Sequence, residues 1–167
     1  ADSAAGDSAG YQKNKREADK LLAVKTSRVE YRDGLIDIRE VFARMVYNSV
    51  YDQINMNTFN FVNATFDDLF TRFPTTAEFT IAYNMVESNT PGILFGQGGQ
   101  NKKDYTTILT RTQEFKEGMV RWCYGTFMAR EASSYEVYQA MQGFNNTLDL
   151  QAVERDILVT DEYANFP

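Results

Sequence analysis

The chain has 167 residues, 43% of them hydrophobic and 14% aromatic, a composition that suits one domain with a buried core. It contains no histidine and one cysteine, which excludes a Ser-His-Asp triad, a Cys-His dyad, an imidazole metal site and an internal disulfide. The net charge of −6 repels phosphate backbones and argues against nucleic acid as a partner. No apolar run is long enough to form a transmembrane segment.

The N-terminal region differs in composition from the rest of the chain. Residues 1–10, ADSAAGDSAG, have the composition of a flexible linker, and the charged residues that follow predict a short exposed helix within 11–30. We therefore expect residues 1–30 to form an N-terminal arm that is either flexible or ordered by a partner. A start in small residues is typical of a chain after signal removal, which favours a periplasmic, cell-surface or extracellular location over a cytoplasmic one. A lipidated cysteine upstream of Ala1 would add a lipid anchor.

Helical spacing of apolar residues and helix caps organise residues 31–167. Asp37 begins a first helix whose apolar positions continue to Tyr51. A second helix covers about 58–72, and Pro74 ends it. Thr75 and Glu78 then form a capping box that opens a third helix.

Residues 88–104 interrupt this pattern, because three glycines within four positions predict a loop. After it, Asp104 caps a short helix and a long helix covers about 113–129. Ser133 and Glu136 form a further capping box, and Gly143 ends the helix that it opens. Asp149 opens another helix before a final turn that holds Tyr163.

An internal repeat accounts for the order of these helices. A shift of 58 residues aligns residues 62–82 with 120–140, a shift of 48 aligns 105–115 with 153–163, and a shift of 112 aligns 37–51 with 149–163. The recurring positions are Arg72 and Arg130, Glu78 and Glu136, and the aromatic residues Tyr51, Phe115 and Tyr163. The fold predicted is an all-α helical bundle with a leading half-repeat (37–55) and two tandem units, 57–115 with the Gly-rich loop and 116–167.

The repeated arginines precede a capping residue and a glutamate. We expect each arginine to fix its turn, either by pairing with the glutamate or by donating to helix-end carbonyls. Cys123 lies on the apolar face of its helix, where a buried, inert thiol is expected.

The repeated motifs resemble those of a known family. The pattern aromatic-x-x-Leu/Phe-x-x-Arg-x-x-Thr/Ser-x-x-Glu is present at Phe66–Glu78 and Tyr124–Glu136, and a second motif covers Ile157–Phe166. These stretches resemble a bacterial helical-repeat domain of unknown function found in secreted and surface-layer-associated proteins and, more distantly, the phycobilisome rod-linker domain. The resemblance implies a scaffold, linker or accessory module with no catalytic residues to carry over.

Two groups of residues are candidates for binding. In the Gly-rich loop they are Phe95, Gly98, Gly99, Lys102 and Lys103, although the loop lacks the G-x-x-x-x-G-K-[ST] spacing of a phosphate cradle. The second group consists of aromatic residues in excess of what two small repeats need for a core, namely Tyr11, Trp122, Tyr135 and Tyr138.

The function predicted is therefore a non-catalytic structural or accessory subunit that binds other protein subunits of a larger bacterial assembly. The alternative is a small-ligand-binding or enzymatic module that uses residues 92–103. No cofactor, metal site or catalytic residue is predicted.

Overall fold

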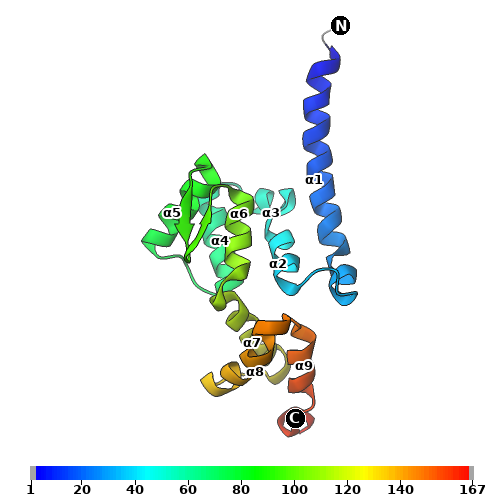
Figure 1. Ribbon diagram of the computed structural model, residues 1–167, viewed down its shortest axis with the longest axis vertical. Coiled ribbons are helices and arrows are strands. Elements are labelled where there is room, and N and C mark those ends of the chain that lie inside the picture. The colour runs from blue at the N-terminus through cyan, green and yellow to red at the C-terminus, as the bar shows by residue number, and fades with distance from the viewer. Residues whose placement is uncertain (1–2, 166–167) are drawn as a thin grey trace.

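A computed structural model describes residues 3–165, which form ten helices and one small two-stranded sheet (Figure 1). The N-terminal helices are α1 (Ser3–Arg32), α2 (Ile38–Val46), α3 (Ser49–Asn55), α4 (Thr58–Phe70) and α5 (Thr76–Ser88). The hairpin strands β1 (Gly92–Leu94) and β2 (Gln97–Gly99) follow, and then α6 (Lys102–Arg111), α7 (Gln113–Met128), α8 (Ser134–Thr147), α9 (Leu150–Leu158) and α10 (Asp161–Ala164). The all-α class is confirmed. No helix within the described residues is long and apolar enough to cross a bilayer.

The N-terminal arm is one 30-residue helix, where the sequence predicted a linker over residues 1–10. Alanine is the best helix former, and the three alanines between Ser3 and Gly10 offset the two glycines, each of which costs about 1 kcal/mol. The helix also needs no new nucleus there, because its C-terminal half is held against α2, where Arg44 pairs with Glu30 at 2.7 Å. Its N-terminal half extends away from the other helices (Figure 1).

The first predicted helix is divided into α2 and α3 at Asn48. The side-chain amide of Asn48 donates to the carbonyls of Arg44 and Met45, which ends α2. Its side-chain oxygen accepts from the backbone N–H groups of Val50 and Tyr51, which begins α3. One buried asparagine therefore caps both helices, and Tyr51 belongs to the second of them.

The predicted Gly-rich loop contains a β-hairpin. Leu94 pairs with Gln97, which leaves Phe95 and Gly96 as a two-residue turn. Both have positive φ (50° and 73°), the geometry of a type I′ turn that suits hairpins. A phenylalanine is unusual at such a position, and its half-buried ring is held by a tilted contact to Phe66 and an edge contact to Phe70. The sequence missed the hairpin because the turn lacks the usual Asn-Gly or Asp-Gly pair.

Helix caps elsewhere follow the sequence with two exceptions. The capping boxes at Thr75 and Ser133 are both formed, and Asp149 caps α9. However, α6 is capped by Asn101 rather than by Asp104, and α8 continues through Gly143 to Thr147. Gly143 is exposed with open space around it, so the helix passes it without a clash.

The repeat is visible in the backbone. Thr71 and Ala129, 58 residues apart, end α4 and α7 in the left-handed conformation. Thr112 and Thr160, 48 residues apart, cap α7 and α10. Because α7 is continuous from Gln113 to Met128, the predicted boundary between the two units, at residues 115 and 116, falls inside a helix that contributes to both units. Phe166 lies outside the described residues.

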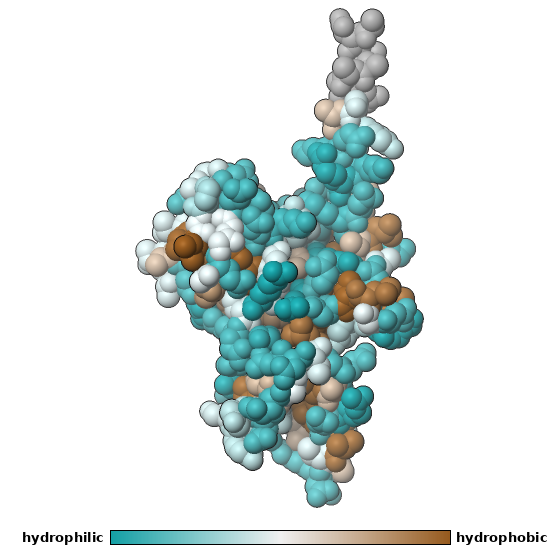
Figure 2. All heavy atoms as spheres, viewed as in Figure 1, coloured by the Kyte–Doolittle hydropathy of each residue, from teal (hydrophilic) through white to brown (hydrophobic). Residues whose placement is uncertain are grey.

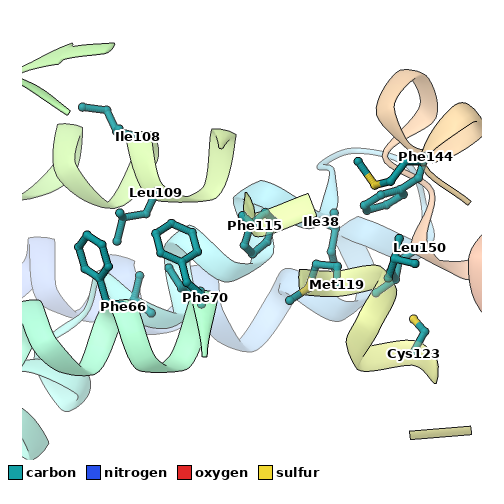
Figure 3. Packing of buried hydrophobic residues seen from close by; sticks show 14 of the residues in the cluster. Ile38, Phe66, Phe70, Ile108, Leu109, Phe115, Met119, Cys123, Phe144 and Leu150 are labelled. Atoms are coloured by element: carbon teal, nitrogen blue, oxygen red, sulfur yellow. The ribbon is translucent and has the colours of Figure 1, made fainter. Parts of the chain in front are cut away.

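A single core connects the units, with Phe115 at their junction (Figure 3). Its buried ring makes an edge contact to Phe42 of α2, with centroids 5.4 Å apart. Phe66, Phe70 and Leu109 lie on one side of it in the view, and Met119, Phe144 and Leu150 lie on the other. Cys123 is fully buried in this core, and burial raises the pKa of its thiol to about 12.

A substitution at Gly99 tests how the hairpin packs against α6. A Cβ at Gly99 would lie 2.8 Å from the Asp104 Cβ and 2.9 Å from the Ile108 Cδ1, whereas a Cβ at Gly98 would meet nothing within 4 Å. We expect Gly99→Ala to lower the free energy of unfolding by about 1–3 kcal/mol through overpacking. The matched variant Gly98→Ala should change it by less than about 0.5 kcal/mol. Chemical denaturation measures both, and equal effects would contradict the packing described.

Candidate functional site

Two arginine forks, each made of one arginine and two glutamates, tie together the helices within each repeat unit. In the first, Arg72 Nη2 donates to Glu78 Oε1 and to Glu114 Oε2, both at 2.9 Å. Arg72 Nη1 also donates to the Phe73 carbonyl at 3.1 Å, so the side chain both pairs with the glutamates and fixes the turn. Glu78 lies in the first turn of α5 and Glu114 in the first turn of α7, so one guanidinium ties the end of α4 to two later helices.

The second fork repeats this geometry 58 residues later. Arg130 Nη2 donates to Glu136 Oε1 at 2.6 Å and to Glu162 Oε2 at 2.8 Å, and Arg130 Nη1 donates to the Glu131 carbonyl at 2.9 Å. Glu136 lies in the first turn of α8 and Glu162 lies in α10. The same contact, made of one arginine, two glutamates and one backbone carbonyl, therefore links the helices of each unit.

The forks perturb the titration of their carboxylates. Hydrogen bonding from Arg72 lowers the pKa of Glu78 to about 2, and hydrogen bonding from Arg130 does the same for Glu136. The glutamates in turn raise the pKa of both arginines. Each fork therefore stays ionised over the physiological range and carries a net charge of −1.

A groove along α7 lies between the forks. It has a volume of about 760 Å³, and residues of both forks, Glu114 and Arg130, line it. We define the α7 groove by four of its lining residues, namely Gly118, Trp122 and Gly125 on one face of α7 and Ala129, which follows the helix. Gly125 is exposed, and a Cβ there would meet nothing within 4 Å, so a partner's backbone can approach α7 closely at this residue, beside the exposed indole.

Two other predicted aromatic residues, Tyr135 and Tyr138, lie on α8. Tyr138 of α8 lines a second hollow that shares Glu117 and Arg121 with the α7 groove, so the two hollows are adjacent. Tyr135 lines a third hollow, between α8 and α9. Trp122, Tyr135 and Tyr138 are 53%, 71% and 60% exposed. Exposed apolar residues are scattered over the face in Figure 2, and Trp122 and Tyr138 line two hollows that share lining residues.

The Gly-rich residues are placed differently. Lys102 pairs with Asp52, and its ammonium lies 3.8 Å from the centre of the Phe61 ring, so its charge is already engaged. Phe95 packs on the core and Gly99 sits tightly against α6, whereas Gly98 is exposed. Lys103 lines a small hollow against α1 and α2. The structure does not bring these five residues into one site. Tyr11 lies on the projecting half of α1, 63% exposed.

Sequence reasoning missed several residues of the groove. Gly118 and Gly125 are seven residues apart in a predicted helix, a spacing that places both on one face. Glu114 and Glu162 align under the shift of 48 residues, and this alignment could have identified the second carboxylate of each fork. Arg121, which donates to the Ala132 carbonyl at 3.3 Å, had no such signal.

Within residues 3–165, no three His, Cys, Asp or Glu side chains are grouped to hold a metal ion. Comparisons with protein-family models, with curated proteins and with solved structures give no match. The resemblance drawn from the motifs therefore stays a prediction.

The forks predict an acid dependence of stability. Glu78 and Glu136 titrate near 4.5 when unperturbed and at about 2 when folded. The unfolded chain therefore takes up protons first, and the free energy of unfolding falls as pH drops from about 4.5 to about 2. Above this window the contribution is complete.

Removing the arginine should flatten this dependence. We expect Arg72→Gln to cost about 1–2 kcal/mol at pH 7, discounted for partial exposure, and to reduce the slope of stability between pH 4.5 and 2. Denaturant titrations across pH measure both quantities. Arg155→Gln is the control, because Arg155 is exposed and forms no ion pair among the described residues. An unchanged slope in Arg72→Gln would contradict the fork's electrostatics.

Proposed function

We propose that this protein is a non-catalytic structural or accessory subunit that binds other protein subunits within a larger bacterial assembly in the envelope or outside the cell. The observation that carries the proposal is the α7–α8 surface, where Trp122 and Tyr138 stand exposed beside adjacent hollows. Tryptophan and tyrosine are the residues that most often dominate the binding energy of protein interfaces.

The chemistry of this surface supports a protein partner. Its charged groups are already engaged in part, since Arg130 is held by two glutamates and Arg121 donates to a backbone carbonyl. Such groups frame an apolar centre with a polar rim, as in protein interfaces. The alternative, a small-ligand or enzymatic module at residues 92–103, is not favoured, because Lys102 is paired with Asp52.

The repeat supports the same proposal. Its recurring positions are apolar residues, helix caps and ion pairs, which build a rigid scaffold. A rigid helix positions an exposed aromatic side chain with little loss of conformational entropy on binding.

Photo-crosslinking in the native cells tests this function. A photoreactive residue at position 122 or 138 should give discrete protein adducts, whereas one at the exposed position Gln151 of α9 should not. Trp122→Ala with the photoreactive residue at 138 should reduce the adduct at least about tenfold while changing stability by less than about 0.5 kcal/mol. Adducts equally strong at 151, or none at 122 and 138, would contradict the proposal.

A further inference from the structure

α1 carries apolar residues on two opposite faces. One contacts the body of the protein through Ala23, Val24, Ser27 and Tyr31, with Ser27 buried. At about 100° per residue, the other face points the opposite way. This face, the arm stripe, consists of Tyr11, Lys15, Ala18, Leu22, Lys25 and Val29, all of them exposed. Its spacing of four, three, four, three and four residues is that of a helix-packing seam.

Charge separates α1 from the rest of the chain. Residues 3–32 contain seven basic and four acidic side chains, which gives +3, whereas residues 33–167 contain ten basic and eighteen acidic ones, which gives −8. The arm stripe carries two lysines and no acid. The surface that complements it is therefore apolar and acidic.

The α7 groove meets both requirements. Glu117 and Glu131 line it together with Arg121, and each of the adjoining forks adds a net charge of −1, so these groups together carry −3. On α7, Gly118, Trp122 and Gly125 have the same spacing of four and three residues as Tyr11, Lys15 and Ala18 on α1. Parallel packing of the two helices places Tyr11 and Ala18 over the two glycines and Lys15 over the Trp122 indole, a favourable cation–π pair.

We propose that the arm stripe of one copy of this chain docks in the α7 groove of a second copy. The inference rests on the proposed function and names the partner of its groove. The free half of α1 lies at one end of the molecule and α7 lies toward the other (Figure 1). The contact is therefore heterologous, and it joins copies head to tail.

Sedimentation velocity on the full chain tests the proposal with two kinds of variant. Lys15→Glu/Leu22→Asn changes the arm stripe at exposed positions. Gly125→Leu fills the groove where a Cβ meets open space, and it raises helix propensity, so α7 remains folded. The matched controls are Lys13→Glu, off the stripe, and Gly143→Leu, which also adds a side chain in open space on a helix.

We expect the unchanged chain to self-associate with a dissociation constant of about 1 mM or lower. A contact made by one helix face should bind no more weakly than this. The arm variant and the groove variant should each associate at least tenfold more weakly, and the two controls should not. Because each variant retains one intact half of the contact, an equimolar mixture should form a one-to-one heterodimer and nothing larger.

Three results would overturn the proposal. The first is an unchanged chain that stays monomeric to about 1 mM. The second is a groove variant that associates as strongly as the unchanged chain, which would indicate symmetric pairing of α1 helices. The third is an equimolar mixture of the two variants that stays monomeric. If the chain stays monomeric while position 122 crosslinks to another protein, this inference fails and the proposed function stands. If position 122 captures no protein, both fail.

Discussion

A guanidinium shared between two carboxylates holds each unit of this fold together. The end of a long helix, the capping box of the next helix and the first turn of a third meet at Arg72, and again at Arg130. The arginine must leave the helix end abruptly to reach both glutamates. The preceding residue, Thr71 or Ala129, provides this by taking positive φ without being glycine. The backbone strain at this residue is thus offset by the four charge-assisted hydrogen bonds that the arginine makes to its two glutamates.

The forks also set the chemistry of the surface between them. Glu114 and Arg130 are held by their forks and at the same time line the α7 groove. Their positions are therefore fixed before any partner arrives, and less entropy is lost on binding. A scaffold contact and a recognition surface share the same side chains.

Much of the fold could be predicted from the sequence, because caps and apolar spacing act over three or four residues. The capping boxes at Thr75 and Ser133 and the offset between Arg72 and Arg130 needed no tertiary information. The break at Asn48 did, because an asparagine in a helical pattern reveals its capping role only when the chain turns there. The turn at Phe95 depends likewise on the pocket formed by Phe66 and Phe70.

The site was less predictable than the fold. Exposed Trp122, Tyr135 and Tyr138 were identified because aromatic residues exceeded what the core could hold. Lys102 was misleading, since a lysine after glycines looks free until Asp52 and Phe61 are brought beside it. The arm was the largest difference, because composition alone does not distinguish an alanine-rich linker from the continuation of a helix.

The continuity of α7 has a consequence for how the chain unfolds. The first turn of α7 completes one fork, and its remaining turns are the long helix of the following unit. If one unit unfolds, the other therefore loses a helix surface against which it packs. Phe115 and Met119, on successive turns of this helix, place the two halves of the core on one rigid element. Melting either half therefore strips α7 of partners on which the other half depends. The helical body behaves as one cooperative folding unit rather than as separable modules.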